Sequence, residues 1–335
     1  MGKPEIYQSL RTFAVADNKK SIIQLTNTLL PYFTIMAIMY WLLKNEYPYW
    51  IVILLAIINA GFMARTFIIF HDCTHGSFFK SRKLCKVIGY FCGIIVFTPF
   101  SDWQYSHKIH HATTSNLDKR GVGDLWMMTV NEYNSSSKFK KFIYRLYRNP
   151  IFLFIIIPAI KFILVQRIPN SFRRNKKLCS HIITTSAIII IIFVAWLTIG
   201  LKNYILIQLP IMIIGGGTGI FLFYIQHQFK GSYWSRDKEW DPFKASMDGA
   251  SFYNLPILLR WFTGNIGFHH IHHLHPGIPN YKLKKCNDEI SVLQNAHELT
   301  LVESFRCSFL KLYDEGSNKM VTFKQAKEAA KTMTS

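Results

Sequence analysis

The stretch from Asn265 to His275 reads NIGFHHIHHLH and places five histidines within eleven residues. Three of them, His269, His272 and His273, form the pattern H-x-x-H-H. Packing gives no reason to crowd imidazoles in this way, whereas neutral imidazole nitrogens are good ligands for iron, zinc, copper or nickel. The stretch therefore predicts a metal site.

Two further histidine clusters lie upstream. Their members are His71 and His75, and then His107, His110 and His111. Residues four apart share one face of a helix, so each cluster can direct two imidazoles towards one metal ion. The three clusters hold eight histidines, whereas a zinc ion takes about four protein ligands. The pattern predicts one site for two metal ions, and His227, at the end of an apolar segment, is a candidate ninth ligand.

Four long apolar segments predict transmembrane helices at about residues 22–43, 51–70, 182–200 and 204–225. A helix needs about 20 apolar residues to cross the hydrocarbon core of a bilayer, and the last two segments carry no charge at all. We therefore expect an all-α integral membrane protein with interfacial helices and a histidine-rich metal cap. A large soluble protein with buried helices is the alternative.

The net charge of +20 is distributed unevenly along the chain. Fourteen lysines and arginines lie between Ser101 and His181, against Lys44 alone and Lys202 alone in the two short turns between the spans. This asymmetry places the long loop and both termini in the cytoplasm. The charges are explained by topology and by anionic lipid, so nucleic acid is not expected as a partner, and some of them are candidates for docking an acidic electron donor.

We expect a single domain over residues 1–335, with a cap formed by residues 71–181 and 226–335. Two shorter apolar segments in it, residues 85–100 and 150–164, are marginal in length for crossing a bilayer. If the first crossed, the second histidine cluster would face away from the first. Both segments are therefore predicted to be interfacial or re-entrant at the cytoplasmic leaflet. The six cysteines show no C-x-x-C spacing and are expected to be free thiols.

Three smaller features carry expectations of their own. Asp118 or Asp124 is placed to accept the second ring N–H of a ligand histidine, although pairing with Lys119 or Arg120 is an equal alternative. The glycines at 215–217 favour close helix packing, with an acyl groove as the second interpretation. Residues 299–313 predict an amphipathic helix.

At this point the chain resembles the membrane fatty-acid desaturases. The segments HDCTHGSFF at 71–79, HKIHH at 107–111 and HHIHH at 269–273 are similar to the three histidine boxes of that family in order and spacing. NLDKRG at 116–121 and GNIG at 264–267 look most similar to the bacterial acyl-lipid branch, which includes the delta-5 desaturases of bacilli. The resemblance implies iron ligands at His71, His75, His107, His110, His111, His227, His269, His272 and His273. His181, His270, His275 and His297 match no ligand position.

The resemblance also implies an activity. Two ferrous ions would use O₂ to insert a cis double bond into the acyl chains of membrane phospholipids, with electrons from a ferredoxin-type donor and its reductase. The expected location is the cell membrane, with every histidine box on the cytoplasmic side. A hydroxylase or ketolase on the same di-iron scaffold, acting on alkanes or carotenoids, is the nearest alternative. A metal transporter or a b-type haem protein is a more distant one.

Overall fold

The computed structural model describes residues 2–169, 172 and 175–332. The predicted domain and cap also reach over residues 1, 170–171, 173–174 and 333–335, which lie outside the described residues. Four helices are long and apolar enough to cross a membrane: α2 (Asn18–Lys44), α3 (Tyr49–His75), α9 (Lys176–Thr198) and α10 (Leu201–His227). They coincide with the four predicted spans.

Helices α2 and α9 begin before the predicted bounds, and a polar side chain caps each of these two starts. The Asp17 side chain accepts hydrogen bonds from the first backbone N–H groups of α2, and Asn175 does the same for α9. Such caps satisfy donors that a helix start leaves open. At the other end, α3 continues through His75 and stops at Gly76, whose left-handed φ of 70° suits glycine. The first histidine pair therefore belongs to the last turns of α3.

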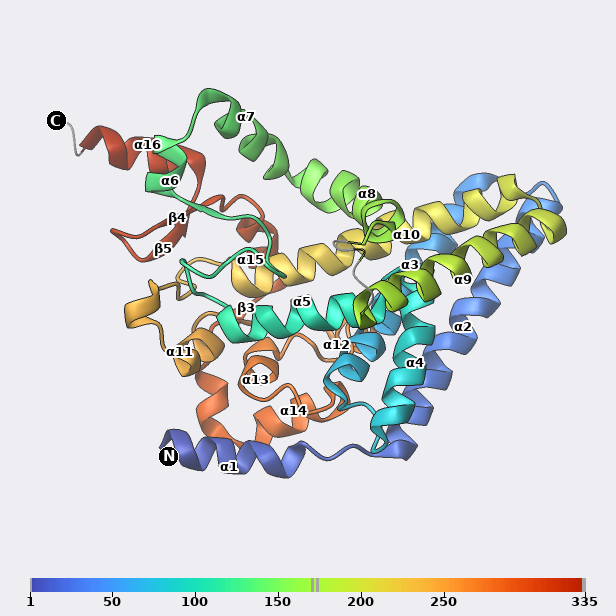
Figure 1. Cartoon of the computed structure of the whole chain (residues 1–335), viewed down its shortest axis with the longest axis horizontal. Helices are drawn as coiled ribbons and strands as arrows, with labels where there is room; N and C mark the ends of the chain where they lie inside the picture. Colours follow the sequence, from blue (N-terminus) through green and yellow to red (C-terminus); the bar gives the residue numbers. More distant parts are fainter. Residues whose placement is uncertain (1, 170–171, 173–174, 333–335) are drawn as a thin grey trace.

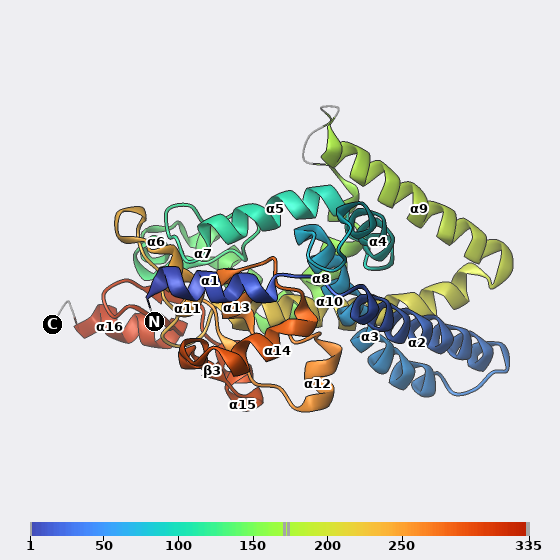
Figure 2. The same ribbon diagram turned by 90° about the horizontal axis from the view of Figure 1, so that it is seen from below.

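The long helices occupy one end of the molecule, and most of the cap and both described ends of the chain occupy the other (Figures 1 and 2). In Figure 1 the turns between α2 and α3 and between α9 and α10 lie on the right. Helix α1 (Lys3–Phe13) runs along one side of the cap, and α16 (Phe323–Thr332) lies near the C-terminus. Metal ligands at the ends of α3 and α10 can therefore meet ligands from the cap.

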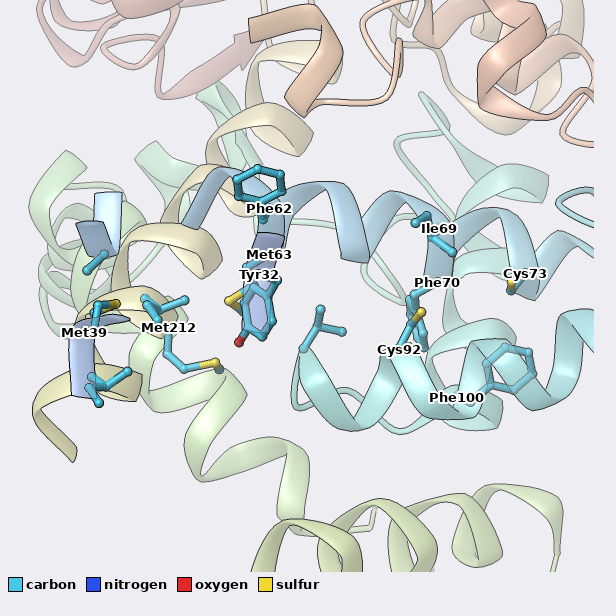
Figure 3. Packing of buried hydrophobic residues seen from close by; sticks show 14 of the residues in the cluster. Tyr32, Met39, Phe62, Met63, Ile69, Phe70, Cys73, Cys92, Phe100 and Met212 are labelled. Atoms are coloured by element: carbon cyan, nitrogen blue, oxygen red, sulfur yellow. The ribbon is translucent and has the colours of Figure 1, made fainter. Parts of the chain in front are cut away.

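Four of the helices pack around one apolar core (Figure 3). Met39 of α2, Met63 and Phe70 of α3, and Met212 of α10 are buried in it, and α4 (Arg82–Ile95) adds Cys92. In lipid, close packing rather than exclusion of water holds such helices together. The close packing of these helices therefore supports the ends of α3 and α10 that carry His71, His75 and His227.

Arg65, the one charged side chain predicted within the second span, is buried in α3. Its Nε donates to Thr28 Oγ1 at 3.0 Å, and its guanidinium lies 4.0 Å from the centre of the Trp261 ring. A second guanidinium nitrogen donates to the Trp261 carbonyl. An arginine is tolerated in such a place when its donors are bonded and its charge faces an aromatic ring. The residue ties α2 and α3 to α12 (Ile257–Phe262).

The two shorter apolar segments form bent helix pairs. Helix α4 meets α5 (Phe100–Thr113) at 100°, and α7 (Lys138–Tyr147) meets the segment Phe152–Arg167 at 63°. That segment consists of the π-helical turn η1 (Phe152–Ile156), α8 (Ile157–Ile163) and the 3₁₀ turn η2 (Val165–Arg167). Such a bend fits either a re-entrant segment or a broken span, which would raise the number of membrane crossings among the described residues to at most six. The placement of these segments at the cytoplasmic leaflet stays a prediction.

The rest of the cap is built from short elements. The helices are α6 (Val130–Ser135), α11 (Pro242–Met247), α13 (His269–Leu274), α14 (Asn280–Glu289) and α15 (Leu301–Cys307), with 3₁₀ turns η3 (Asp237–Glu239) and η4 (Ser291–Asn295). One small sheet has the order β1 (Met128–Thr129), β4 (Leu312–Asp314), β5 (Lys319–Val321). A second pairs β2 (Phe252–Tyr253) with β3 (Glu298–Leu299) in parallel. With strands this short, the predicted all-α class is confirmed.

The predicted helix over residues 299–313 is wrong in extent. Only Leu301–Cys307 is helical, and the chain then turns and enters β4 at Leu312. The cause is competition for the backbone carbonyls: Tyr144 donates to the Lys311 carbonyl, and Arg148 Nη2 donates to the Leu310 carbonyl at 3.0 Å. These partners come from a distant part of the chain, so the local pattern does not reveal them.

Candidate metal centre

The structure brings all nine predicted histidines together in two groups, and within each group the potential ligand nitrogens lie within 4.8 Å of one another. The first group consists of His71, His75, His107, His111 and His272, and the second of His110, His227, His269 and His273. The groups are neighbours, because the rings of His111 and His273 stack with their centres 4.3 Å apart. Each of the two adjacent groups could hold a metal ion.

Helices α5 and α13 each contribute to both groups. On α5, His107 and His111 are four residues apart and join the first group, while His110 joins the second. On α13 the second group takes the i,i+4 pair, His269 and His273, and the first takes His272. The H-x-x-H-H pattern therefore has a structural meaning: two residues on one helical face reach one site, and the third turns towards the other.

The ring nitrogens stand at ligand spacing. In the first group Nε2 of His107 lies 3.0 Å from that of His71, and Nε2 of His272 lies 2.9 Å from that of His111. In the second, Nε2 of His227 lies 2.9 Å from that of His269. Two nitrogens bound at about 2.1 Å to one metal, at right angles, are about 3.0 Å apart. The donor set thus fits a metal ion within each group.

The imidazoles are buried in a way that favours their neutral form. Burial, and then the charge of neighbouring imidazoles, lowers the pKa of His107, His111, His269, His272 and His273 well below its ordinary value. Neutral imidazole is the form that binds a metal ion. The surroundings of these five histidines therefore favour the form that can bind a metal ion.

Carboxylates and a carbonyl orient several of these rings through the second ring nitrogen. His110 Nδ1 lies 2.6 Å from Asp124 Oδ1, and His227 Nδ1 lies 3.2 Å from the Gly249 carbonyl. Such a partner sets the tautomer and leaves the other nitrogen for a metal. Asp118 instead pairs with Arg236 at 2.6 Å. Of the two predicted acids, Asp124 is the one that contacts a histidine of the centre.

Asp72 is an orienting residue that sequence reasoning missed. Its Oδ1 lies 3.1 Å from His71 Nδ1, and its Oδ2 accepts hydrogen bonds from the backbone N–H and the side-chain amide of Asn280 at 2.7 and 2.8 Å. Asp72 thereby connects the end of α3 to the start of α14. Its only signal in the sequence is its position directly after His71.

The four histidines that match no ligand position lie outside both groups. His270 is fully buried beside the centre, and His297 stacks on Phe229 at 4.8 Å. His181 Nε2 is 3.5 Å from an Asp102 oxygen, and His275 is half-buried.

One cavity of about 380 Å³ reaches both groups, because His71 and His107 of the first and His269 of the second line it. Most of its wall is apolar and comes from α3, α5, the segment around α8, and α10. Two of the three glycines for which helix packing or an acyl groove was predicted, Gly215 and Gly216, also line this cavity. The packing interpretation also holds for them, since a Cβ on Gly215 would lie 2.9 Å from Met63 Sδ.

Comparison with known proteins agrees with this arrangement. Residues 48–304 match the family model described as "Fatty acid desaturase". The chain is 42% identical over 323 residues to a "Fatty acid desaturase" of Bacillus subtilis (strain 168), covering 96% of this chain and 91% of the relative.

More distant relatives carry more specific names. The chain is 27% identical to an "sn-1 acyl-lipid omega-3 desaturase (ferredoxin)" of Synechocystis, covering 74% of this chain and 69% of that one. It is 27% identical to an "sn-1 oleoyl-lipid 12-desaturase" of Picosynechococcus, covering 74% and 71%. With a family model that spans most of its length, four candidate membrane helices and clustered histidines, this chain belongs to the fatty acid desaturase family, whose members are oxidoreductases.

Proposed function

We propose that the chain is an acyl-lipid desaturase that uses O₂ to insert a cis double bond into the acyl chains of membrane phospholipids. The observation that carries the proposal is the single, mostly apolar cavity that both histidine groups reach. An acyl chain held in it has its methylenes beside the two groups, and holding the reacting carbon in place is the main contribution of the protein. The acyl-lipid names of the cyanobacterial relatives support this substrate class.

Two iron ions are the proposed cofactor, held by His71, His75, His107, His111 and His272 in one group and by His110, His227, His269 and His273 in the other. All-nitrogen groups suit iron, copper or zinc and hardly suit magnesium or calcium. Bound iron supplies the O₂ chemistry that can oxidise an unactivated methylene. The residues Asp72 and Asp124 hold the rings of His71 and His110, and the apolar walls keep water away from the reacting carbon.

A ferredoxin-type protein with its reductase is the proposed electron donor. Two relatives, from Synechocystis and Nostoc, carry "(ferredoxin)" in their names. Lys108, Lys138 and Lys140 are exposed basic residues of the cap, and they suit the docking of an acidic donor. The proposed location is the cell membrane, with the cap and both termini in the cytoplasm.

The proposed position of the double bond is five carbons from the carboxyl end. Its support is the similarity of residues 116–121 and 264–267 to the bacillus branch, together with the identity to the Bacillus subtilis relative over most of the chain. Gas chromatography and mass spectrometry of derivatised fatty acids from an expressing host locate the bond.

The proposed function can be tested in a bacterial host that expresses the chain together with a ferredoxin and its reductase. The measurement is the fatty-acid composition of the host's lipids. We expect new unsaturated chains from the wild type and none from His107→Ala or His272→Ala, with both variants still in the membrane. His297→Gln, which lies outside both groups, is the control and should remain active. Hydroxylated products in place of unsaturated ones would indicate the alternative hydroxylase, and activity in both alanine variants would refute the ligand assignment.

A further inference from the structure

One stripe of α10 follows the cavity and ends at the metal centre. Gly215, Gly219, Phe223 and Gln226 line the cavity at spacings of three or four residues, and His227 follows directly. Residues at this spacing share one face of a helix. Gly219 is eight residues before His227, which is about 12 Å along the helix axis at about 1.5 Å per residue.

Gly219 differs from the three glycines that precede it on α10. A Cβ on Gly215 would lie 2.9 Å from Met63 Sδ, and one on Gly216 would lie 3.0 Å from the Phe162 ring. A Cβ on Gly217 would collide with the Phe154 carbonyl oxygen. At Gly219 a Cβ would meet no heavy atom of the described residues within 4 Å. Helix packing therefore explains the absence of a side chain at 215, 216 and 217, but not at 219.

Gly219 lines the cavity, and most of the cavity wall is apolar. Met63 and Ala64 of α3 and Ile220 of α10 line the same cavity. The stripe runs from the cap end of α10 into the body of a helix that is long and apolar enough to cross a membrane. A polar headgroup stays at the water interface, so the part of an acyl chain that extends along α10 away from His227 is its methyl end.

We propose that Gly219 determines the length of acyl chain that the cavity accepts beyond the reacting carbon. The proposal rests on the desaturase function proposed above and adds a specificity-determining residue to it. One leaflet of the hydrocarbon core is about 15 Å deep, half of about 30 Å. The methyl end of a chain that extends about 12 Å or more beyond the metal centre therefore reaches Gly219. The methyl end of a shorter chain stops before Gly219.

The test compares Gly219→Leu with Thr218→Leu in the coexpression host, with 14-, 16- and 18-carbon saturated chains supplied. Thr218 is the matched control because it adjoins Gly219 on α10, does not line the cavity, and donates its hydroxyl only to the Ile214 carbonyl within its own helix. The measured quantity is the desaturated fraction of each chain length. Gly219→Leu should lower the ratio of desaturated 18-carbon to desaturated 14-carbon chains by about tenfold or more, because one methylene of lost room already has an effect of about tenfold and leucine adds a larger side chain.

Gly219→Ala should shift the ratio in the same direction by less, which keeps the test available if the leucine variant does not fold. A ratio unchanged from the wild type in the folded variants, or an equal loss at every chain length, would overturn the role of Gly219. A wild type that desaturates no chain length would instead refute the proposed function, so the two failures are distinguishable.

Discussion

Asp124 and Asp118 lie six residues apart, yet they belong to different environments. Asp124 contacts His110 at 2.6 Å with its side chain nearly buried, while Asp118 is an exposed partner of Arg236. A buried partner of a ligand histidine holds the ring and raises its basicity. A surface ion pair contributes little to stability.

Asp124→Asn should therefore lower iron retention and desaturase activity by about 10- to 100-fold, because the amide keeps the shape but loses the charge. Asp118→Asn should leave both nearly unchanged. The measurement is iron content after dialysis of the purified protein, followed by activity. Equal behaviour of the two variants would show that the contact with His110 does not influence the centre.

The sequence did not predict which histidine belongs to which of the two groups. His110 and His111 are neighbours in the chain, but they belong to different groups because successive residues of a helix point about 100° apart. Which of them faces which site depends on how α5 is rotated against α3 and α10. Spacing predicts that these side chains gather, and the packing of the helices assigns them.

At the scale of elements, the backbones of α10 and η1 approach each other closely at Gly217. A Cβ on Gly217 would collide with the Phe154 carbonyl oxygen, whereas Gly219 has open space. Overpacking of a rigid contact costs about 1–3 kcal/mol or more.

Gly217→Ala should consequently lower the melting temperature in detergent by several degrees, with a loss of folded protein. Gly219→Ala adds the same methyl group two residues away and should melt close to the wild type. The comparison controls for the general effect of alanine on a helix. A Gly217→Ala protein as stable as Gly219→Ala would mean that α10 and η1 are not in close contact.

A second element-scale feature joins the C-terminal segment to α7 and α10 without any carboxylate. Arg148 is fully buried and donates to Tyr224 and to Gln228, and the Lys311 Nζ donates to the Arg148 carbonyl. Burial, and then the charge of Arg148, lowers the pKa of Lys311 to about 7. An unfolded lysine has a pKa of about 10.4.

Between these two pKa values the unfolded chain binds one more proton than the folded chain, so stability should rise with pH from about 7 to 9.5, by at most about 1.4 kcal/mol per unit. Thermal melting of detergent-solubilised protein measures the trend. Lys311→Met should flatten it, and Lys284→Met, whose ammonium pairs with Asp288 on the surface, should not. An unchanged slope in Lys311→Met would contradict the assignment.

The sequence predicted a helix correctly where the helix contains a long apolar segment or a pair of histidines four residues apart. The four long helices and the helical end of α3 are of this kind, because length and periodicity are local. The C-terminal segment was not, since the carbonyls of Leu310 and Lys311 bond to Arg148 and Tyr144 from another part of the chain. Asp72 falls between the two cases: its position is local, but its partner Asn280 is distant.

At the scale of the whole molecule, the predicted membrane topology places both histidine groups on the cytoplasmic side. A Cys179→Ser background removes the one exposed cysteine among the described residues. In it, Glu46→Cys, between α2 and α3, should react with a membrane-impermeant maleimide in intact cells. Lys119→Cys, in the cap, should react only after the membrane is opened. Labelling of Lys119→Cys from outside would show that the segment containing α4 and α5 crosses the bilayer.

The proposed centre holds two metal ions side by side, with nine histidines as ligands in two groups. The most direct measurement is the iron content of the purified, fully loaded protein against its polypeptide concentration, with zinc and copper determined in the same sample. We expect about two iron atoms per chain. The iron content should fall in His272→Ala, which removes a nitrogen from the first group, and in His273→Ala, which removes one from the second. No more than one iron per chain in the wild type would contradict the proposed centre.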